Sequence, residues 1–184
     1  MKLLWNYKAL TFDQEVWQNK IFPQHQWLLK TITRLDPQTI LEVGCGFGRN
    51  LKFLLHHGLD PRRLAGVDFS QVMLHKAKRN LGKKLSLTKA SVLKLPFQAK
   101  KFDLVFTHGL LMHLPPPDLP QALVELTRVS KKYLIIIEEI RVQPRQLNYF
   151  TWAHDYDKII STLPLQVVIK KKGKYSLIWY LLKK

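Results

Sequence analysis

Short apolar runs alternate along this chain with longer segments in which apolar residues recur every three or four positions. The short runs predict buried strands, and the longer segments predict helices. The predicted strands are 39–43, 64–67, 85–87, 102–106 and 133–137. The predicted helices are 11–33 (divided at Pro23), a segment from the glycine-rich loop to His57, one capped by Ser70, 117–129 and 152–162. Two last strands, 166–170 and 175–181, flank a Lys-Lys-Gly-Lys turn and predict an antiparallel hairpin.

Alternating strands and helices are typical of an α/β fold, in which helices cover both faces of a parallel sheet. The continuous apolar run at 133–137 agrees with this, because a strand covered on both faces needs no polar side. We therefore predict a doubly wound, mostly parallel seven-stranded sheet that ends in an antiparallel hairpin. The length of 184 residues fits a single domain at 1–184, with a helical N-terminal lid at 1–35 and a core at 36–184.

Composition narrows the class of protein further. The single cysteine, Cys45, excludes a disulfide framework, and no His, Cys, Asp or Glu cluster has metal-ligand spacing, so we expect no metal. We find neither a membrane-spanning run nor a secretory signal, and therefore expect a cytoplasmic location. The net charge of +17 favours RNA, anionic membranes or anionic acceptors as partners, while a basic solvated surface without a specific partner explains it equally well.

A glycine-rich loop follows the first predicted strand and opens a helix, which is where open parallel sheets bind ligands. Gly44, Gly46 and Gly48 would let a ligand approach the backbone. Asp68 ends the second strand, where a carboxylate can accept both hydroxyl protons of a ribose. The dinucleotide fingerprint needs a glycine at position 49, which is Arg49, and Glu42 suits a cationic ligand better than a pyrophosphate. The loop therefore favours S-adenosylmethionine over NAD.

At these residues the chain resembles the class I S-adenosylmethionine-dependent methyltransferases. Segment 40–48 (ILEVGCGFG) is similar to their first motif and 66–70 (GVDFS) to their second. Segments 95–97 (LPF) and 102–114 (FDLVFTHGLLMHL) resemble the fourth-strand region of the small-molecule branch. The resemblance covers about 39–137, and the family's Rossmann-like seven-stranded sheet also ends in a hairpin.

The resemblance implies a role for each matching residue toward S-adenosylmethionine and its product S-adenosylhomocysteine. The loop with Gly44, Cys45, Gly46 and Gly48 would pass the methionine part, with Glu42 near its ammonium group. Asp68 would bind the ribose, Phe69 and Val92 would contact the adenine, and Thr107 would lie beside the methyl group. Ser91 stands where family members commonly have an Asp that binds the adenine amino group, which implies a weaker hydrogen bond there.

Candidates for a general base are His108 and His113, then Glu138 and Glu139, and His154 in the segment that follows. Each has a structural alternative: His113 as a packed helix histidine, Glu138 as a strand-end cap, and His154 as part of an ordinary helix start. A base is needed only if the acceptor must lose a proton.

The leading hypothesis is a methyltransferase that moves a methyl group to an oxygen or nitrogen of a small acceptor by in-line displacement. One alternative is an RNA- or ribosome-associated methyltransferase that uses the basic surface. Another is a non-catalytic, methyltransferase-like subunit that binds a partner. Covalent pyrimidine methylation is excluded because Cys45 lies in the glycine loop, and the Pro115-Pro116-Pro117-Asp118 segment is a poor match to adenine N6-methyltransferases.

Overall fold

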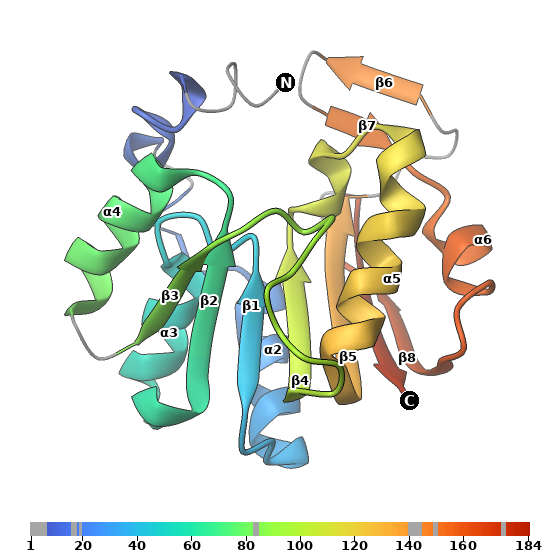
Figure 1. The fold of residues 1–184 in the computed structure, drawn as a ribbon, viewed down its shortest axis with the longest axis horizontal. Helices are drawn as coiled ribbons and strands as arrows, with labels where there is room; N and C mark the ends of the chain where they lie inside the picture. Colours follow the sequence, from blue (N-terminus) through green and yellow to red (C-terminus); the bar gives the residue numbers. More distant parts are fainter. Residues whose placement is uncertain are drawn as a thin grey trace.

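The computed structural model describes residues 7–15, 18, 20–82, 85–139, 145–148 (backbone only), 151–173 and 176–184. Its centre is a seven-stranded sheet with the order β3-β2-β1-β4-β5-β9-β8 (Figure 1). The strands are β1 (Ile40–Val43), β2 (Leu64–Asp68), β3 (Ser86–Lys89), β4 (Phe102–His108), β5 (Ser130–Glu139), β8 (Gln166–Lys172) and β9 (Leu177–Lys183). The predicted seven-stranded α/β sheet is confirmed.

The directions in which neighbouring strands pair determine which strand ends lie at the same edge of the sheet. Strands β3, β2, β1, β4 and β5 run parallel, whereas β9 is antiparallel to both β5 and β8. The terminal hairpin is therefore also confirmed. Because parallel strands end at the same edge, the last residues of β1, β2, β4 and β5 meet at one side of the sheet, where such folds bind ligands.

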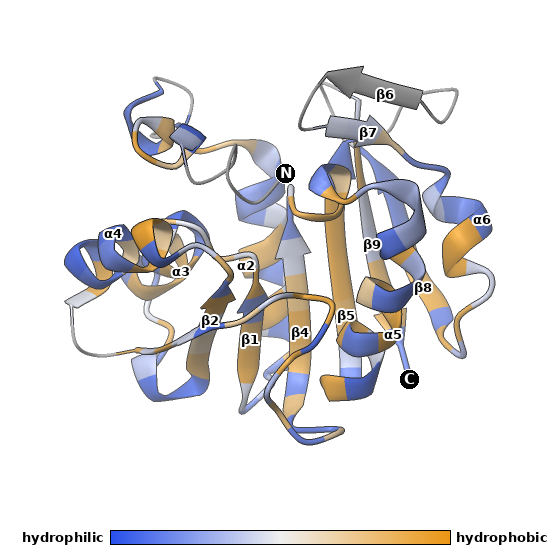
Figure 2. Ribbon diagram, turned by 45° about the horizontal axis from the view of Figure 1, so that its top comes forward, coloured by the Kyte–Doolittle hydropathy of each residue, from blue (hydrophilic) through white to orange (hydrophobic). Residues whose placement is uncertain are grey.

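Helices cover both faces of this sheet (Figure 1). One face packs against α2 (Pro23–Leu35), α3 (Arg49–His56) and α4 (Gln71–Leu81), and the other against α5 (Leu119–Val129) and α6 (Tyr156–Ile160). Short 3-10 turns are η1 (Phe12–Gln14), η3 (Pro61–Arg63), η5 (Leu111–His113) and η6 (Pro116–Asp118). The central strands β1, β4 and β5 are mostly apolar, as Figure 2 shows, because both of their faces are covered, whereas the edge strands β3 and β8 are more polar and more exposed.

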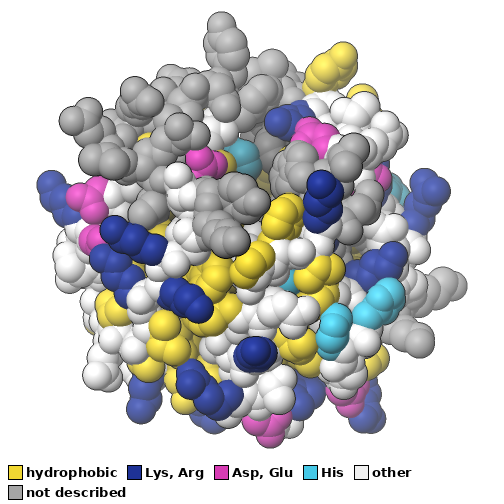
Figure 3. All heavy atoms as spheres, turned by 180° about the vertical axis from the view of Figure 1, so that it is seen from behind, with side chains coloured by type: hydrophobic (Ala, Val, Ile, Leu, Met, Phe, Trp, Pro, Cys, Tyr) yellow, Lys and Arg dark blue, Asp and Glu magenta, His cyan; other side chains and the backbone are white. Residues whose placement is uncertain are grey.

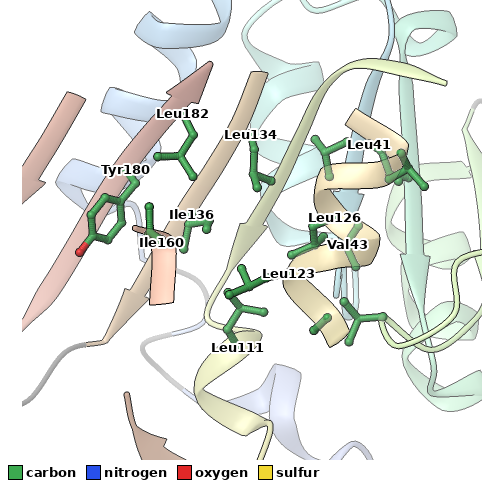
Figure 4. Close-up of a cluster of buried hydrophobic side chains, with 14 of the residues drawn as sticks. Leu41, Val43, Leu111, Leu123, Leu126, Leu134, Ile136, Ile160, Tyr180 and Leu182 are labelled. Carbon is green, nitrogen blue, oxygen red and sulfur yellow. The ribbon is translucent and has the colours of Figure 1, made fainter. Parts of the chain in front are cut away.

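Strand β5 illustrates how the sequence builds two cores. Leu134 and Ile136 join the cluster under α5, together with Leu123 and Leu126 (Figure 4). The alternate residues, among them Ile135, join the opposite cluster with helices α2, α3 and α4. All are almost fully buried, so each apolar position of this strand contributes to one core or the other.

The N-terminal region differs from the expectation of a helix over 11–33. In the described part of 11–33 the helical residues are those of η1, residue 18 in 3-10 conformation, and α2. Helix α2 begins at Pro23, which takes the first helical position, where its missing N–H costs nothing. The His25 side chain caps the helix, because its Nδ1 accepts the Phe22 backbone N–H at 3.0 Å. Leu28 and Ile32 are buried in the sheet core, so α2 is a packed element of the fold.

A second difference lies after β5. A helix was expected over 152–162, but Thr151–Ala153 forms strand β7, which pairs with β6 (Arg145–Asn148) in a separate two-stranded sheet. Helix α6 spans only Tyr156–Ile160, because the Asp155 side chain accepts the Lys158 N–H and fixes the helix start. Thr151 and Trp152 are residue types that favour strands. Among the residues described, every helix is too short or too polar to traverse a lipid bilayer.

Candidate active site

The loop between β1 and α3 wraps tightly against the end of β2. The backbone N–H groups of Gly44 and Cys45 both donate to the Val67 carbonyl, at 2.8 and 3.0 Å. Gly44, Gly46 and Gly48 all have positive φ, which glycine adopts without strain. At Gly46 a Cβ would meet nothing within 4 Å, so the backbone there faces open space. The loop thus presents a bare backbone surface to a ligand.

Asp68, the last residue of β2, is tied to this loop. Its Oδ2 accepts the Gly46 N–H at 2.9 Å and its Oδ1 accepts the Ser70 N–H at 2.8 Å. Burial raises its pKa, although these hydrogen bonds act in the opposite direction. Each oxygen keeps a lone pair, so the carboxylate can still accept hydroxyl protons from a ligand.

Glu42, in β1, is 1% exposed and receives the Asn50 Nδ2 at 2.6 Å on its Oε1. Its Oε2 is buried without a hydrogen-bond partner. Burial raises the pKa of Glu42 to about 8, despite the hydrogen bond from Asn50 and the charge of Arg49. A buried oxygen without a partner is costly, which indicates that a ligand donor completes this site.

These groups line one cavity of about 700 Å³, a volume typical of ligand sites. Phe69, Ser91 and Val92 line it, as expected from the sequence. Ser91 Oγ accepts the Leu93 N–H at 3.3 Å, which orders this segment as a turn. N-terminal residues also contribute to the wall, namely Lys8, Phe12, Gln18 and Phe22. The predicted lid region therefore lies over the cavity, and its opening and closing stay a prediction.

His108 and His113 both line the same cavity. His108 Nδ1 lies 3.1 Å from Asn50 Oδ1, and its ring centroid is 5.3 Å from that of His25 in α2. Burial holds the pKa of His108 well below its usual value, and the nearby Arg49 and His25 lower it further. His108 is therefore neutral near pH 7.

Three predicted site residues lie elsewhere. Glu138 is fully buried and does not line the cavity, because its carboxylate accepts the backbone N–H groups of Leu110, Leu111 and Met112. Thr107 Oγ1 donates to Glu138 instead of facing a ligand, which corrects its expected place beside a methyl group.

His154 is the third of these residues. It is 4% exposed, its Nε2 pairs with the Leu114 carbonyl at 3.0 Å, and it does not line the cavity. For His154 and Glu138 the structure therefore supports a structural role.

Glu139, a base candidate from the sequence, lines the cavity. Three further cavity residues were not predicted from the sequence: Arg49 and Asn50 from the first turn of α3, and Gln24 from α2. Position 50 follows the glycine loop by only two residues, which was the available signal for Asn50. In the part of the chain that the structure describes, no group of His, Cys, Asp and Glu could hold a metal.

A sheet of this order, with a glycine loop after β1 and an acidic residue ending β2, defines a class I methyltransferase. Residues 40–133, about half of the chain, match the model of the family described as "Methyltransferase domain". The chain belongs to this methyltransferase family.

Two curated relatives are also methyltransferases. An uncharacterized methyltransferase of Schizosaccharomyces pombe is 37% identical over 115 residues, which cover 57% of this chain and 40% of that protein. A demethylmenaquinone methyltransferase of Bacteroides fragilis is 30% identical over 160 residues, which cover 82% and 63%. The chain thus spans less than two thirds of the length of either relative.

Solved structures show the same fold. Magnesium protoporphyrin IX methyltransferase of Synechocystis with bound SAH has a TM-score of 0.78 at 14% identity, with 100% of both chains covered. The 1,6-didemethyltoxoflavin-N1-methyltransferase of Burkholderia thailandensis, with its acceptor and S-adenosylhomocysteine, has a TM-score of 0.76 at 15% identity and covers 100% of this chain and 88% of that chain.

Proposed function

We propose that this chain transfers a methyl group from S-adenosylmethionine to an oxygen or nitrogen of a small acceptor molecule. The observation that carries the proposal is one continuous cavity. The glycine loop, Glu42 and Asp68 line this cavity together with two histidines, His108 at the end of β4 and His113 in η5.

The residues present fit this cofactor. The buried Oε2 of Glu42, which has no hydrogen-bond partner, would accept the ammonium group, and the open backbone at Gly46 leaves room for the amino-acid part. Asp68 would bind the ribose hydroxyls, and Phe69 and Val92 would contact the adenine. When bound, the cofactor supplies a methyl group activated by a sulfonium. Structures of similar fold with bound SAH support the assignment.

Ser91 can still accept a hydrogen bond from the adenine amino group, which is the function expected at its position. Its hydroxyl accepts the Leu93 N–H and has a second lone pair for a ligand donor such as the adenine amino group. A neutral hydroxyl makes a weaker hydrogen bond to that group than a carboxylate does. The proposal therefore includes a modest affinity for the adenine end.

The acceptor part of the wall combines apolar and polar side chains. Phe22, Met112 and Leu177 provide apolar contacts, and His108 and Glu139 provide polar ones. Methyl transfer depends on alignment of the nucleophile and on exclusion of water, and these apolar residues would serve both purposes. Neutral His108 can take a proton from the molecule that receives the methyl group. Because its pKa is lowered, His108 is a weak base and would deprotonate an acidic hydroxyl most readily. Arg49, in the same wall, suits an anionic acceptor.

The named relatives support a small acceptor, since their names refer to magnesium protoporphyrin IX, 1,6-didemethyltoxoflavin and demethylmenaquinone. The RNA alternative rests on the net charge of +17. Figure 3 shows one face of the molecule, where Lys and Arg side chains are separated by uncharged surface instead of forming one strip. The cavity wall, which carries more apolar than polar surface, also favours a small molecule.

A labelling experiment tests the proposal. The protein is incubated with S-adenosylmethionine that carries a tritiated methyl group, together with either a library of phenols, carboxylic acids and amines or total RNA. We expect label in the small molecules, blocked by excess S-adenosylhomocysteine and reduced in His108→Gln but not in the surface control His56→Gln. Label in RNA alone would support the RNA alternative. Cofactor binding without any transfer would support the partner-binding subunit.

A further inference from the structure

Three side chains from three elements form a line through the buried edge of the site. Asn50, from α3, is 5% exposed and stands between Glu42 of β1 and His108 of β4. Its Nδ2 lies 2.6 Å from Glu42 Oε1, and its Oδ1 lies 3.1 Å from His108 Nδ1. Glu42 belongs to the part of the wall proposed to bind the cofactor ammonium, and His108 to the acceptor part. Asn50 thus connects the two functions of the cavity.

The two ends of an amide are not equivalent. Because the Asn50 NH₂ group donates to the Glu42 carboxylate, its oxygen must face His108 and accept a hydrogen bond from Nδ1–H. A neutral imidazole carries one proton, so Nε2 of His108 then has a free lone pair. In this arrangement His108 can accept a proton or a hydrogen bond from an acceptor molecule.

A proton on Oε1 of Glu42 would reverse this arrangement. Oε1 is the oxygen that faces the Asn50 amide, whereas Oε2 has no hydrogen-bond partner in the described part of the chain. A carboxylic acid O–H therefore finds a partner when it lies on Oε1 and the amide oxygen of Asn50 turns toward it. If the amide turns to accept it, the NH₂ group faces His108, so Nδ1 must accept and the imidazole proton moves to Nε2. His108 would then be a donor and could no longer act as a base.

We propose that Asn50 is a positioning residue that transmits the charge state of Glu42 to His108, so that His108 presents its Nε2 lone pair only when Glu42 is ionised. The role of this coupling in catalysis rests on the proposed function, because the ammonium group of the bound cofactor would be the cation that ionises Glu42. The acceptor would then meet a basic His108 only in the cofactor-bound protein.

The surroundings of both groups support this coupling. Glu42 has a pKa of about 8 because of burial, so a nearby cation would change its charge at neutral pH. Arg49, Asp68 and Cys45 are the other charged or titratable groups that act on or sense Glu42. Burial first, and then Arg49 and His25, hold the pKa of His108 well below its usual value.

His25 provides an internal comparison. Its Nδ1 lies 3.0 Å from the backbone nitrogen and 3.3 Å from the backbone oxygen of Phe22, so this nitrogen bonds to the helix cap and not to Asn50. The ring signals of His25 should therefore not follow the charge of Glu42 through Asn50, whereas those of His108 should.

Nitrogen-15 NMR of the histidine rings tests the proposal, because protonated and unprotonated ring nitrogens differ strongly in chemical shift. His108→Gln identifies the signals of His108. In the ligand-free protein we expect His108 to change from the Nε2–H to the Nδ1–H tautomer as pH rises through about 8, the pKa of Glu42. Asn50→Leu and Glu42→Gln should each abolish this change. Asn80→Leu, which removes a hydrogen bond to the glycine loop at Phe47, should preserve it.

S-adenosylhomocysteine, which keeps the ammonium group, supplies the second arm. At pH 7 its binding should convert His108 to the Nδ1–H form. An unchanged tautomer across pH 6–9, or on ligand binding, overturns the proposal, as does a change that persists in Asn50→Leu. If Asn50→Leu does not fold, Glu42→Gln decides the question. Failure of the ligand to bind would instead overturn the proposed function, since the pH arm needs no ligand.

Discussion

The Asp68 carboxylate accepts the Gly46 backbone N–H at 2.9 Å, which ties the end of β2 to the glycine loop across 22 residues. One side chain therefore both shapes the loop and faces the cavity. Asp68→Ala should weaken S-adenosylhomocysteine binding by about 10- to 100-fold, because hydrogen bonds to a charged group are worth about 1.5–3 kcal/mol each. Isothermal calorimetry measures the change. Asp60→Ala, which removes an exposed cap of η3, should bind like the wild type, and equal affinity in both variants would refute the ribose role.

A comparison of Gly48 with Gly58 distinguishes the cost of a steric clash from the cost of a positive φ. Its φ is +84°, and a Cβ would lie 2.7 Å from Leu81 Cδ1. Gly58 has a φ of +87° with nothing within 4 Å of a Cβ. Gly58→Ala should therefore cost only the backbone term of about 1–2 kcal/mol. Gly48→Ala should cost more and should also weaken ligand binding. Chemical denaturation and calorimetry measure the two effects, and equal losses in both variants would contradict the packing described.

Glu138 should behave as a structural residue. Its two oxygens accept backbone N–H groups from the 110–112 segment, and a Gln amide nitrogen cannot accept any. We expect Glu138→Gln to lose about 1–3 kcal/mol of unfolding free energy. Glu139→Gln, at the cavity wall, should keep its stability and change acceptor turnover instead. Urea denaturation of both variants checks this, and an undiminished stability of Glu138→Gln would return Glu138 to the list of catalytic candidates.

Glu42 should make the ligand-free protein less stable as pH rises. Its pKa is raised from 4.5 to about 8 on folding, so the unfolded chain releases its proton first and stability is lost between these values. Each unit of difference corresponds to about 1.4 kcal/mol. Glu138, with a pKa raised to about 7, acts in the same direction. Glu42→Gln should therefore unfold at a higher temperature than the wild type at pH 8.5, with little difference at pH 4.5. The same difference at both pH values would show that Glu42 does not titrate as described.

Proton linkage tests the ion pair between Glu42 and the ligand ammonium. At pH 6.5 the ligand amino group is already an ammonium, while Glu42, with a pKa of about 8, is mostly protonated. Binding of S-adenosylhomocysteine should therefore release a proton from Glu42 at pH 6.5. Calorimetry in buffers of different ionisation enthalpy measures this. Glu42→Gln should lose the release at low pH, and a release that remains would point to another group.

Much of the fold was predictable because its signals are local. The apolar runs of β1, β4 and β5 and the glycine loop are each contiguous in sequence, so their positions could be predicted. Strand β7 was missed because a three-residue strand carries no period, and its partner β6 is the element that stabilises it. Helix α2 was placed too early because the apolar spacing continues before Pro23.

Some residues of the candidate site could likewise be predicted from the sequence, and others could not. Glu42, Asp68 and the glycines were predictable because they follow strands that must end at one edge. Glu138 and Glu139 are adjacent, yet only Glu139 lines the cavity, and the choice between them depends on the loop that Glu138 binds. Asn50 lies only two residues after the glycine loop, but its contacts could not be predicted from the sequence, since its two partners are 8 and 58 residues away.

The proposed cofactor site is tested most directly by calorimetric titration of the full chain with S-adenosylhomocysteine at pH 7. We expect saturable one-to-one binding that weakens in Asp68→Ala and Gly48→Ala. Absence of binding to the folded wild-type protein at millimolar ligand would contradict this site.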